Sequence, residues 1–419
     1  MAEIKPFKGI RYSNKIEDLS KVVTQPYDKI TKEMQEDYYN KSEYNIVRII
    51  FGKTFPDDNQ NNNQYTRARD YFERWQTDGI LIQDSKPSIY PYYQEYRWGG
   101  RQFLRRGFIC LIKLEDFSTG TVLPHERTMF GPKEDRLKLL RATKANFGQI
   151  FMLYPDPKNT VASLIEDHIR DEEPIINTYE SYEDNVRHKV WRIDSEEIIE
   201  EVKKSVKDKT LLIADGHHRY ETALKYFNEN PNAGYRMVTL VSMDDPGLLI
   251  LPTHRAIYGV GNLDNFLSKV SEFFEIEQIS NKEILFKVME GKKHCFGLFF
   301  GGKFYFLILK DEDLIDRFVE KDKSPEYKLL DAIVLHAILI EHILGISKEE
   351  QASKQKIDYF RDVNLGIEGV NKGKYDLVFF MNPTQIDEVK QISEKKELMP
   401  QKSTDFYPKL ITGLVINRL

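Results

Sequence analysis

The segment Leu211-Leu212-Ile213-Ala214-Asp215-Gly216-His217-His218-Arg219-Tyr220-Glu221-Thr222-Ala223-Leu224 gives the clearest structural signal in this chain. Its first half is an apolar run that stops at a glycine, which predicts a buried strand followed by a turn. Its second half has helical periodicity, so a helix is expected to begin next to Gly216. Two imidazoles and a guanidinium therefore gather where a helix presents unpaired backbone N–H groups.

This arrangement is typical of a phosphate-binding loop. A helix N-terminus carries a partial positive charge, and Arg219 adds a planar fork that suits phosphate oxygens. Asp215 could hold a metal ion or orient an imidazole. In the alternative interpretation Asp215 caps the helix, and His217 and His218 are surface or packing residues. We favour the phosphate loop, because three such donors beside a glycine turn seldom cluster for packing alone.

The composition limits the class of protein. The chain has 419 residues, of which 41% are hydrophobic and 12% aromatic, enough for a sizeable core. A net charge of -5 argues against a general nucleic-acid surface, which needs a basic excess. Two cysteines at no metal-ligand spacing argue against disulfides, and no apolar run reaches the roughly 18 residues that span a bilayer. We expect a cytoplasmic globular protein.

Strands and helices alternate along the chain, with polar residues at strand ends, which predicts an α/β or α+β core. Residues 194–197 read as a capping box led by Asp194. The main predicted helices cover 65–77, 133–143, 195–206, 263–274 and 327–344; the main predicted strands cover 88–96, 107–114, 237–243 and 376–380, with a hairpin over 296–309.

A second group of chemically capable residues follows Pro124. His125 and Glu126 lie directly after a short strand, where ligand crevices tend to form. Glu126 could accept a proton from a substrate hydroxyl, and His125 could face a transferring phosphate. The alternative interpretation is a solvated loop in which Glu126 pairs with Arg127 or Lys133.

Two further segments carry groups that could contact phosphate oxygens. Thr253, His254 and Arg255 repeat the pairing of imidazole and guanidinium after a strand and a proline. Residues 402–404 place a cation and two hydroxyls after Pro400; they are Lys402, Ser403 and Thr404. A charged C-terminal loop without a ligand is the default alternative for this last segment.

Several familiar signatures are missing from the sequence. It has no Walker loop, no Rossmann glycine fingerprint, no HExxH motif and no protein-kinase set. Adjacent histidines such as His217 and His218 cannot chelate one metal as an i, i+4 pair would, so no structural zinc site is expected.

Ordered motifs along nearly the whole chain resemble those of domain-of-unknown-function family 1015. The motifs are Pro6 to Tyr12, Pro26-Tyr27-Asp28, Asn45 to Arg48, Pro124 to Thr128, Ala214 to Ala223, Leu251 to Arg255, Met399 to Lys409 and Gly413-Leu414-Val415. The family name itself implies no function.

The Asp-Gly-His-His-Arg run also looks like the nucleotide loop of the ParB/sulfiredoxin superfamily, some members of which phosphorylate free L-serine. This resemblance implies a mixed-sheet core with elaborated N- and C-terminal regions, divided as 1–118, 119–260 and 261–419. It implies that Asp215 to Arg219 bind nucleotide, with Thr222 one turn further on, and that Glu126 is the base. The separation of Glu126 from Asp215 exceeds that in those kinases, so an insertion that includes the helix from Ser195 would fill it.

The function implied by the resemblance is transfer of a phosphoryl group from ATP or ADP to L-serine, with Mg²⁺, to give O-phospho-L-serine. The expected partners are therefore a nucleotide and a small-molecule substrate, not nucleic acid or membrane. Two alternatives stay open at this point. One is a nucleotide-responsive switch that binds a protein partner, and the other is a phosphatase.

Overall fold

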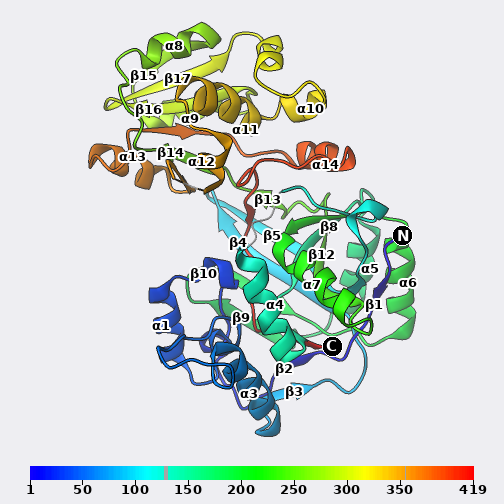
Figure 1. The fold of residues 1–419 in the computed structure, drawn as a ribbon. Coiled ribbons are helices and arrows are strands. Elements are labelled where there is room, and N and C mark those ends of the chain that lie inside the picture. The colour runs from blue at the N-terminus through cyan, green and yellow to red at the C-terminus, as the bar shows by residue number, and fades with distance from the viewer. Residues whose placement is uncertain (127–130, 354) are drawn as a thin grey trace. The chain divides into compact units, whose positions relative to one another are not determined.

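The computed structural model of this protein describes residues 1–126, 131–353 and 355–419 (Figure 1). The chain folds into two compact units. Unit 1 comprises residues 1–124, 128–249 and 408–419, and unit 2 comprises residues 125–127 and 250–407. Unit 1 combines elements of the first two predicted segments, because β5 (Arg101–Lys113) pairs with β12 (Tyr235–Ser242). The division into 1–118, 119–260 and 261–419 stays a prediction.

Unit 1 is built on a mixed sheet, to which nine strands contribute among the described residues. Along the sheet the strand order is β6-β11-β8-β12-β5-β4-β10-β9, with β1 paired to β5. β11 runs parallel to β6 and antiparallel to β8, while β8 and β12 are parallel. This confirms the expected mixed α/β fold class. The remaining strands of the sheet are β1 (Ile4–Lys5), β4 (Tyr90–Trp98), β6 (Val122–Leu123), β8 (Ile150–Tyr154), β9 (Ile176–Glu180), β10 (Glu183–Val190) and β11 (Leu211–Asp215).

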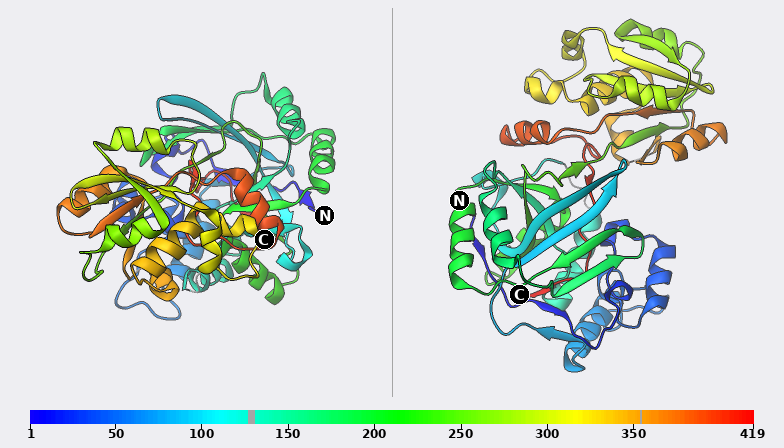
Figure 2. Two further views of the ribbon diagram at one scale, coloured as in Figure 1. Left: turned by 90° about the horizontal axis from the view of Figure 1, so that it is seen from above. Right: turned by 180° about the vertical axis from the view of Figure 1, so that it is seen from behind.

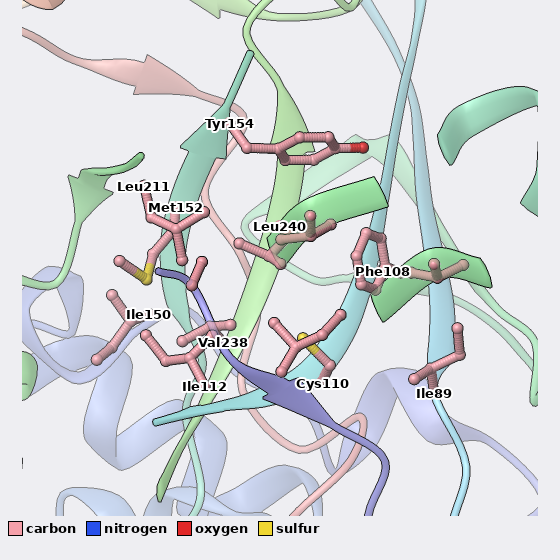
Figure 3. Packing of buried hydrophobic residues seen from close by; sticks show 14 of the residues in the cluster. Ile89, Phe108, Cys110, Ile112, Ile150, Met152, Tyr154, Leu211, Val238 and Leu240 are labelled. Carbon is pink, nitrogen blue, oxygen red and sulfur yellow. The ribbon is translucent and has the colours of Figure 1, made fainter. Parts of the chain in front are cut away.

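Alternation along the strands produces the main core of unit 1 (Figure 3). Phe108, Cys110 and Ile112 are spaced two apart on β5 and so share one face of the sheet. On the same side, Val238 and Leu240 project from the neighbouring strand β12. Helices α5 and α6 add Val161, Ile165, Ile199 and Val202 to this cluster, which shows that both cover this face.

Helices near the N-terminus of the chain form a second core in unit 1. Residues of α1, α2 and α3 pack with β2 in a separate apolar cluster. Both chain termini belong to unit 1 (Figure 1). Besides the strands of the large sheet, unit 1 contains β2 (Ile10–Tyr12), β3 (Leu81–Gln83), β7 (Ala145–Asn146), β21 (Asn417–Arg418), α1 (Lys32–Lys41), α2 (Val47–Ile50), α3 (Gln64–Thr77), α4 (Gly131–Thr143), α5 (Thr160–Ile169), α6 (Glu196–Lys207), α7 (His217–Glu229) and the 3-10 turns Leu19–Lys21, Tyr27–Lys29 and Phe117–Thr119.

Unit 2 has its own antiparallel sheet, in the order β15-β17-β16-β19-β14-β18. Figure 2 shows the same unit from two further directions. Its strands are β14 (His254–Ile257), β15 (Phe274–Ile279), β16 (Cys295–Phe300), β17 (Lys303–Leu309), β18 (Ile357–Phe360), β19 (Leu377–Phe380) and β20 (Phe406–Tyr407), and β13 (Leu249–Ile250) lies at the division. Its helices are α8 (Phe266–Phe273), α9 (Lys282–Met289), α10 (Pro325–Lys328), α11 (Asp331–Val334), α12 (Lys348–Ser353), α13 (Val363–Asn371), α14 (Ile386–Glu394), a 3-10 helix (Glu312–Arg317) and a π-helix (Leu335–Ile343).

Most predicted elements are confirmed, and two predictions are wrong. The helix 195–206 exists as α6, but no side-chain capping bond forms at its N-cap, Ser195. The predicted helix 327–344 is interrupted: α10 ends at Lys328, Leu330 is extended, and the chain then continues as α11 and a π-helix. The apolar periodicity of this region predicts neither the extended conformation of Leu330 nor the wider turn of the π-helix.

No helix in the described part of the chain is both long and apolar enough to cross a lipid bilayer.

Candidate functional site

The predicted strand, turn and helix around Gly216 are confirmed in unit 1. β11 ends at Asp215, and Gly216 is the N-cap of α7 with a φ of 100°. This left-handed conformation favours glycine, and a Cβ at this position would lie 3.0 Å from Nε of Arg219. The N-cap is a glycine, so it supplies no side-chain acceptor to the first N–H groups of α7.

Asp215 anchors the guanidinium of Arg219 instead of capping the helix. Its Oδ2 accepts a hydrogen bond from Nη2 of Arg219 at 2.7 Å, and its Oδ1 lies 3.4 Å from Nζ of Lys409. Nη1 of Arg219 donates to the carbonyl of Gln149. Burial opposes ionisation of Asp215, but the charges of Lys409 and Arg219 hold the pKa of this carboxyl well below its usual range. The loop thus carries a fixed, ionised pair beside the helix N-terminus.

The two histidines lie in the first turn of α7 and are half-buried. Burial lowers the pKa of His218, with Glu221 acting in the opposite direction, so His218 stays a neutral donor or acceptor near pH 7. The positive charge that His217 can carry also lowers the pKa of Asp215. Thr222 is buried, and its hydroxyl donates to the carbonyl of His218 at 2.7 Å. This bond lies within α7 and reaches back by one helical turn.

A second cluster forms in unit 2, where the structure brings residues 125 and 126 to the segment after Met399. The Met399 N–H donates to the carbonyl of His125 at 2.8 Å, and the Lys402 N–H donates to Oε1 of Glu126 at 3.2 Å. Nε2 of the fully buried His125 lies 2.7 Å from Oγ1 of Thr404. Two of the separately predicted segments are thereby neighbours. Arg127, Thr128 and residues 129–130 lie outside the described residues.

Arg255 completes this cluster from β14. Its buried guanidinium donates to the carbonyl of Thr253, to the carbonyl of Lys402 at 3.2 Å, and to Nε2 of His336 at 3.4 Å. Burial lowers the pKa of Arg255 to about 10, while Tyr359 and Glu126 raise it. Arg255 therefore remains charged at pH 7 and faces Glu126. The hydroxyl of Ser403 donates to the carbonyl of Pro400 at 2.8 Å and closes the turn.

His254 does not join the cluster, although it is adjacent to Arg255 in sequence. Successive residues of a strand face opposite sides, and His254 packs among the rings of Phe286, Phe360 and Phe380. Its Nδ1 accepts the N–H of Met381 at 3.2 Å, and burial lowers its pKa to about 3. His254 is a neutral core residue, and we leave it out of the proposed site.

Lys133, one of the two cations expected as alternative partners of Glu126, pairs with another carboxylate. Lys133 forms an ion pair with Glu221 of α7 in unit 1. Glu126 accepts a hydrogen bond from the Lys402 N–H and faces Arg255, which is far from it in the sequence. The alternative pairing with Arg127 lies outside the described residues.

Sequence analysis missed a cavity in unit 2 and the histidine that borders it. The cavity measures about 230 Å³ and is lined by residues of the π-helix, by Tyr359 and by Met399 to Gln401. His336 contributes to its wall, and Nδ1 of His336 lies 2.6 Å from Oε1 of Gln351. A histidine within the apolar run 333–340 was the available signal, because an isolated polar residue in such a run needs a partner.

The fit to Mg²⁺ can be tested on the donors present. Within residues 1–126, 131–353 and 355–419, no group of three or more His, Cys, Asp or Glu side chains is arranged to hold a metal ion. Asp215, the carboxylate of the loop, is already shared between Arg219 and Lys409. These residues do not form a protein cage for Mg²⁺.

A family profile matches residues 4–333, more than three quarters of the chain. The chain belongs to the family described as protein of unknown function (DUF1015). This confirms the family assignment that the ordered motifs predicted. A search of curated proteins finds no match to the chain.

Solved structures similar to this chain include a conserved hypothetical protein from Pyrococcus furiosus, with a TM-score of 0.37, 15% identity, and coverage of 74% of this chain and 94% of that one. A free serine kinase variant in complex with AMP has a TM-score of 0.39 and 15% identity, and covers 74% of this chain and 91% of its own. SbnI from Staphylococcus aureus has a TM-score of 0.36 and 10% identity, with coverage of 73% and 86%. Similarities of this size establish nothing about activity.

Proposed function

We propose that this DUF1015 protein is a phosphotransferase that moves a phosphoryl group from ATP or ADP to the hydroxyl of free L-serine. The observation that carries the proposal is the N-terminus of α7, where the backbone N–H groups of the first turn adjoin the fixed guanidinium of Arg219. Backbone N–H groups and a guanidinium at a helix N-terminus recognise phosphate oxygens. The Asp-Gly-His-His-Arg run that forms this turn resembles that of the free L-serine kinases.

Pre-organisation strengthens this interpretation of the loop. Asp215 and the Gln149 carbonyl hold Arg219 in place before any ligand arrives, so little side-chain entropy is lost on binding. Gly216 has no Cβ and leaves the guanidinium in this position. His217 and His218 supply further donors in the first turn. We therefore assign nucleotide phosphates to the segment Asp215 to Arg219.

In the proposed reaction, the serine Oγ forms a bond to phosphorus while the bond from phosphorus to the bridging oxygen of the nucleotide breaks. The serine proton passes to Glu126, and the products are O-phospho-L-serine and ADP, or AMP when ADP is the donor. A carboxylate base suits this step, because phosphoryl transfer depends on positioning and charge neutralisation. The base role of Glu126 comes from the family resemblance, and the ordering of its side chain by the Lys402 N–H is compatible with it.

We assign supporting roles to the neighbours of Glu126. His125 is fully buried against Thr404, so it positions the Glu126 backbone and does not itself contact the donor. Arg255 places a positive charge opposite the Glu126 carboxylate. Mg²⁺ would accompany the nucleotide phosphates, as hard cations prefer phosphate oxygens and water. We derive no step through the ion, because the described residues do not form a cage for it.

The test is to incubate the protein with L-serine and either ATP or ADP, with Mg²⁺ present, and to detect O-phospho-L-serine by ³¹P NMR. Glu126→Gln should lower kcat by about 10²- to 10⁴-fold with little change in nucleotide affinity, because the amide cannot accept the proton. Glu290→Gln, an exposed position in unit 2, is the matched control and should keep the wild-type rate.

Three outcomes would overturn the proposal. Nucleotide binding without consumption would favour a nucleotide-responsive switch. Phosphate release that needs no acceptor would favour a phosphatase. Equal rates of phosphoserine formation in Glu126→Gln and Glu290→Gln would remove Glu126 as the base.

A further inference from the structure

A small cavity in unit 1 is bordered by Arg219 and Thr222 of α7. Its volume is about 60 Å³, several times the roughly 10–15 Å³ that one water needs. Polar groups from separate segments line it: Tyr27, Arg136, Arg219, Arg236 and Thr412. Tyr27 and Thr412 lie in or beside motifs that the nucleotide loop does not use.

Three guanidinium groups meet at this cavity, and their charges are not all balanced. Arg136 pairs with Asp135, and Arg219 pairs with Asp215. Arg236 forms no ion pair with any described residue, although its side chain is more than nine-tenths buried. Removing a guanidinium from water without a counter-charge costs free energy, so an anion bound beside Arg236 would stabilise the folded protein.

The Arg236 side chain also has a buried donor without an acceptor among the described residues. Nη2 donates to the carbonyl of Gly148 at 3.0 Å, but Nε has no acceptor among the described residues. Burial lowers the pKa of Arg236 to about 9, and the charge of Arg219 adds to this effect. At pH 7 the group is still protonated, so a donor and a full positive charge remain unsatisfied in the cavity wall.

The segment next to the cavity contains further buried polar atoms without partners in the described chain. Both amide atoms of Gln149 are buried and unpaired, as is Nδ2 of Asn146. Buried polar atoms in folded proteins nearly always have partners, so a cluster of exceptions indicates a binding site for a ligand or water. Water supplies an acceptor but no negative charge, and an anion supplies both.

We infer that this cavity binds a compact oxyanion of the phosphate class, held by Arg136, Arg219 and Arg236. The cavity size restricts the occupant to an isolated anion or to one phosphate group of a larger molecule. The guanidinium fork matches tetrahedral oxyanions by paired N–H donors. The site shares Arg219 with the proposed nucleotide loop, but anion binding there needs neither Glu126 nor phosphoryl transfer.

Thermal unfolding in phosphate and in chloride of equal ionic strength tests the inference. The wild-type midpoint should rise with phosphate and saturate, as expected for a ligand that binds only the folded state. Arg236→Met should abolish this rise, and its phosphate affinity by calorimetry should fall at least tenfold. Arg101→Met, an exposed position on β5, should behave as wild type.

Gly148→Ala fills the cavity while it keeps all three charges. Its Cβ would lie 3.4 Å from Nη1 of Arg219 and 3.5 Å from Oγ1 of Thr412, which is tolerable contact. This variant should fold and should bind phosphate more weakly than wild type. It therefore tests the cavity even if Arg236→Met fails to fold.

Titrations with inorganic phosphate and with AMP distinguish the two sources of the anion. Binding of phosphate that depends on Arg236 assigns the cavity to a free anion, and binding of AMP alone assigns it to a nucleotide phosphate group. Phosphate and AMP binding unaffected by both cavity variants, or no stabilisation beyond that of chloride, would overturn the inference. Because Glu126→Gln should keep phosphate binding, failure here is distinguishable from failure of the kinase proposal.

Discussion

The chain contains the dipeptide His-Arg after a strand in both units, and the two copies differ in secondary structure and burial. His218 and Arg219 lie in the first turn of a helix, half-buried, with Arg219 held by a carboxylate. His254 and Arg255 lie within β14, fully buried on opposite sides of the strand. We propose a ligand-binding role only for the pair that begins a helix. Within β14, His254 packs among aromatic rings, and Arg255 donates hydrogen bonds to the carbonyls of Thr253 and Lys402.

Burial sets the energetic difference between the two arginines and gives the largest expected effect. Arg255→Met leaves the carbonyls of Thr253 and Lys402 without these donors and Glu126 without a facing cation, and should destabilise unit 2 by about 3 kcal/mol or more. Arg219→Met breaks a less buried pair and should cost unit 1 about 1–2 kcal/mol.

Separate probes are available for the two units. The three tryptophans, Trp75, Trp98 and Trp191, all lie in unit 1, so their fluorescence reports unfolding of that unit. Amide hydrogen exchange in β14 and β19 reports unit 2. Greater loss of protection with Arg219→Met than with Arg255→Met in those strands would contradict the comparison.

The two histidines should differ in how they couple stability to pH. His254 has a pKa of about 3 in the folded protein and about 6.5 when unfolded, so between these values the unfolded state binds the extra proton. Stability is therefore complete above pH 6.5 and falls as the pH is lowered, by roughly 2.7 kcal/mol from His254 alone at pH 4.5.

His254→Asn should remove this share of the pH dependence of urea unfolding, because an asparagine does not titrate. Its amide oxygen can still accept the Met381 N–H that Nδ1 accepts in wild type. His218→Asn is the matched variant at a half-buried position and should change the slope less. The comparison is wrong if the two variants flatten the slope equally.

Hydroxyl groups beside the two motifs should give the smallest effects. Thr404→Val removes the partner of the buried His125 ring and should cost about 1 kcal/mol. Thr222→Val removes a bond to the carbonyl of His218 that the helix does not need, so its cost should be close to zero. Chemical denaturation of both variants measures the difference, and a larger cost for Thr222→Val would reverse the ranking.

Local sequence predicted the α7 loop because every signal for it lies within fourteen consecutive residues. The glycine at positive φ, the apolar strand and the helical periodicity are short-range features. The position of His254 depends on rings that come from 286, 360 and 380, and no local pattern reports them. Arg236 gave no signal at all, because a lone arginine at the start of a strand is normally exposed.

The neighbours of Glu126 were predicted in part. The strand end and Pro124 indicated a site, and residues 402–404 were singled out separately. Their contact with each other arises because the Glu126 segment pairs with Met399 across more than 270 residues of chain. Such a pairing is a tertiary fact that residue spacing does not contain.

Calorimetric titration with ADP tests most directly whether the turn at Gly216 binds nucleotide phosphates. Gly216→Ala places a Cβ 3.0 Å from Nε of Arg219, and Gly120→Ala is a matched control in the same unit, since Gly120 also has a positive φ but no atom within 4 Å of its Cβ position. We predict that ADP affinity falls at least tenfold in Gly216→Ala and is unchanged in Gly120→Ala. Equal ADP affinity in the two folded variants would contradict the account.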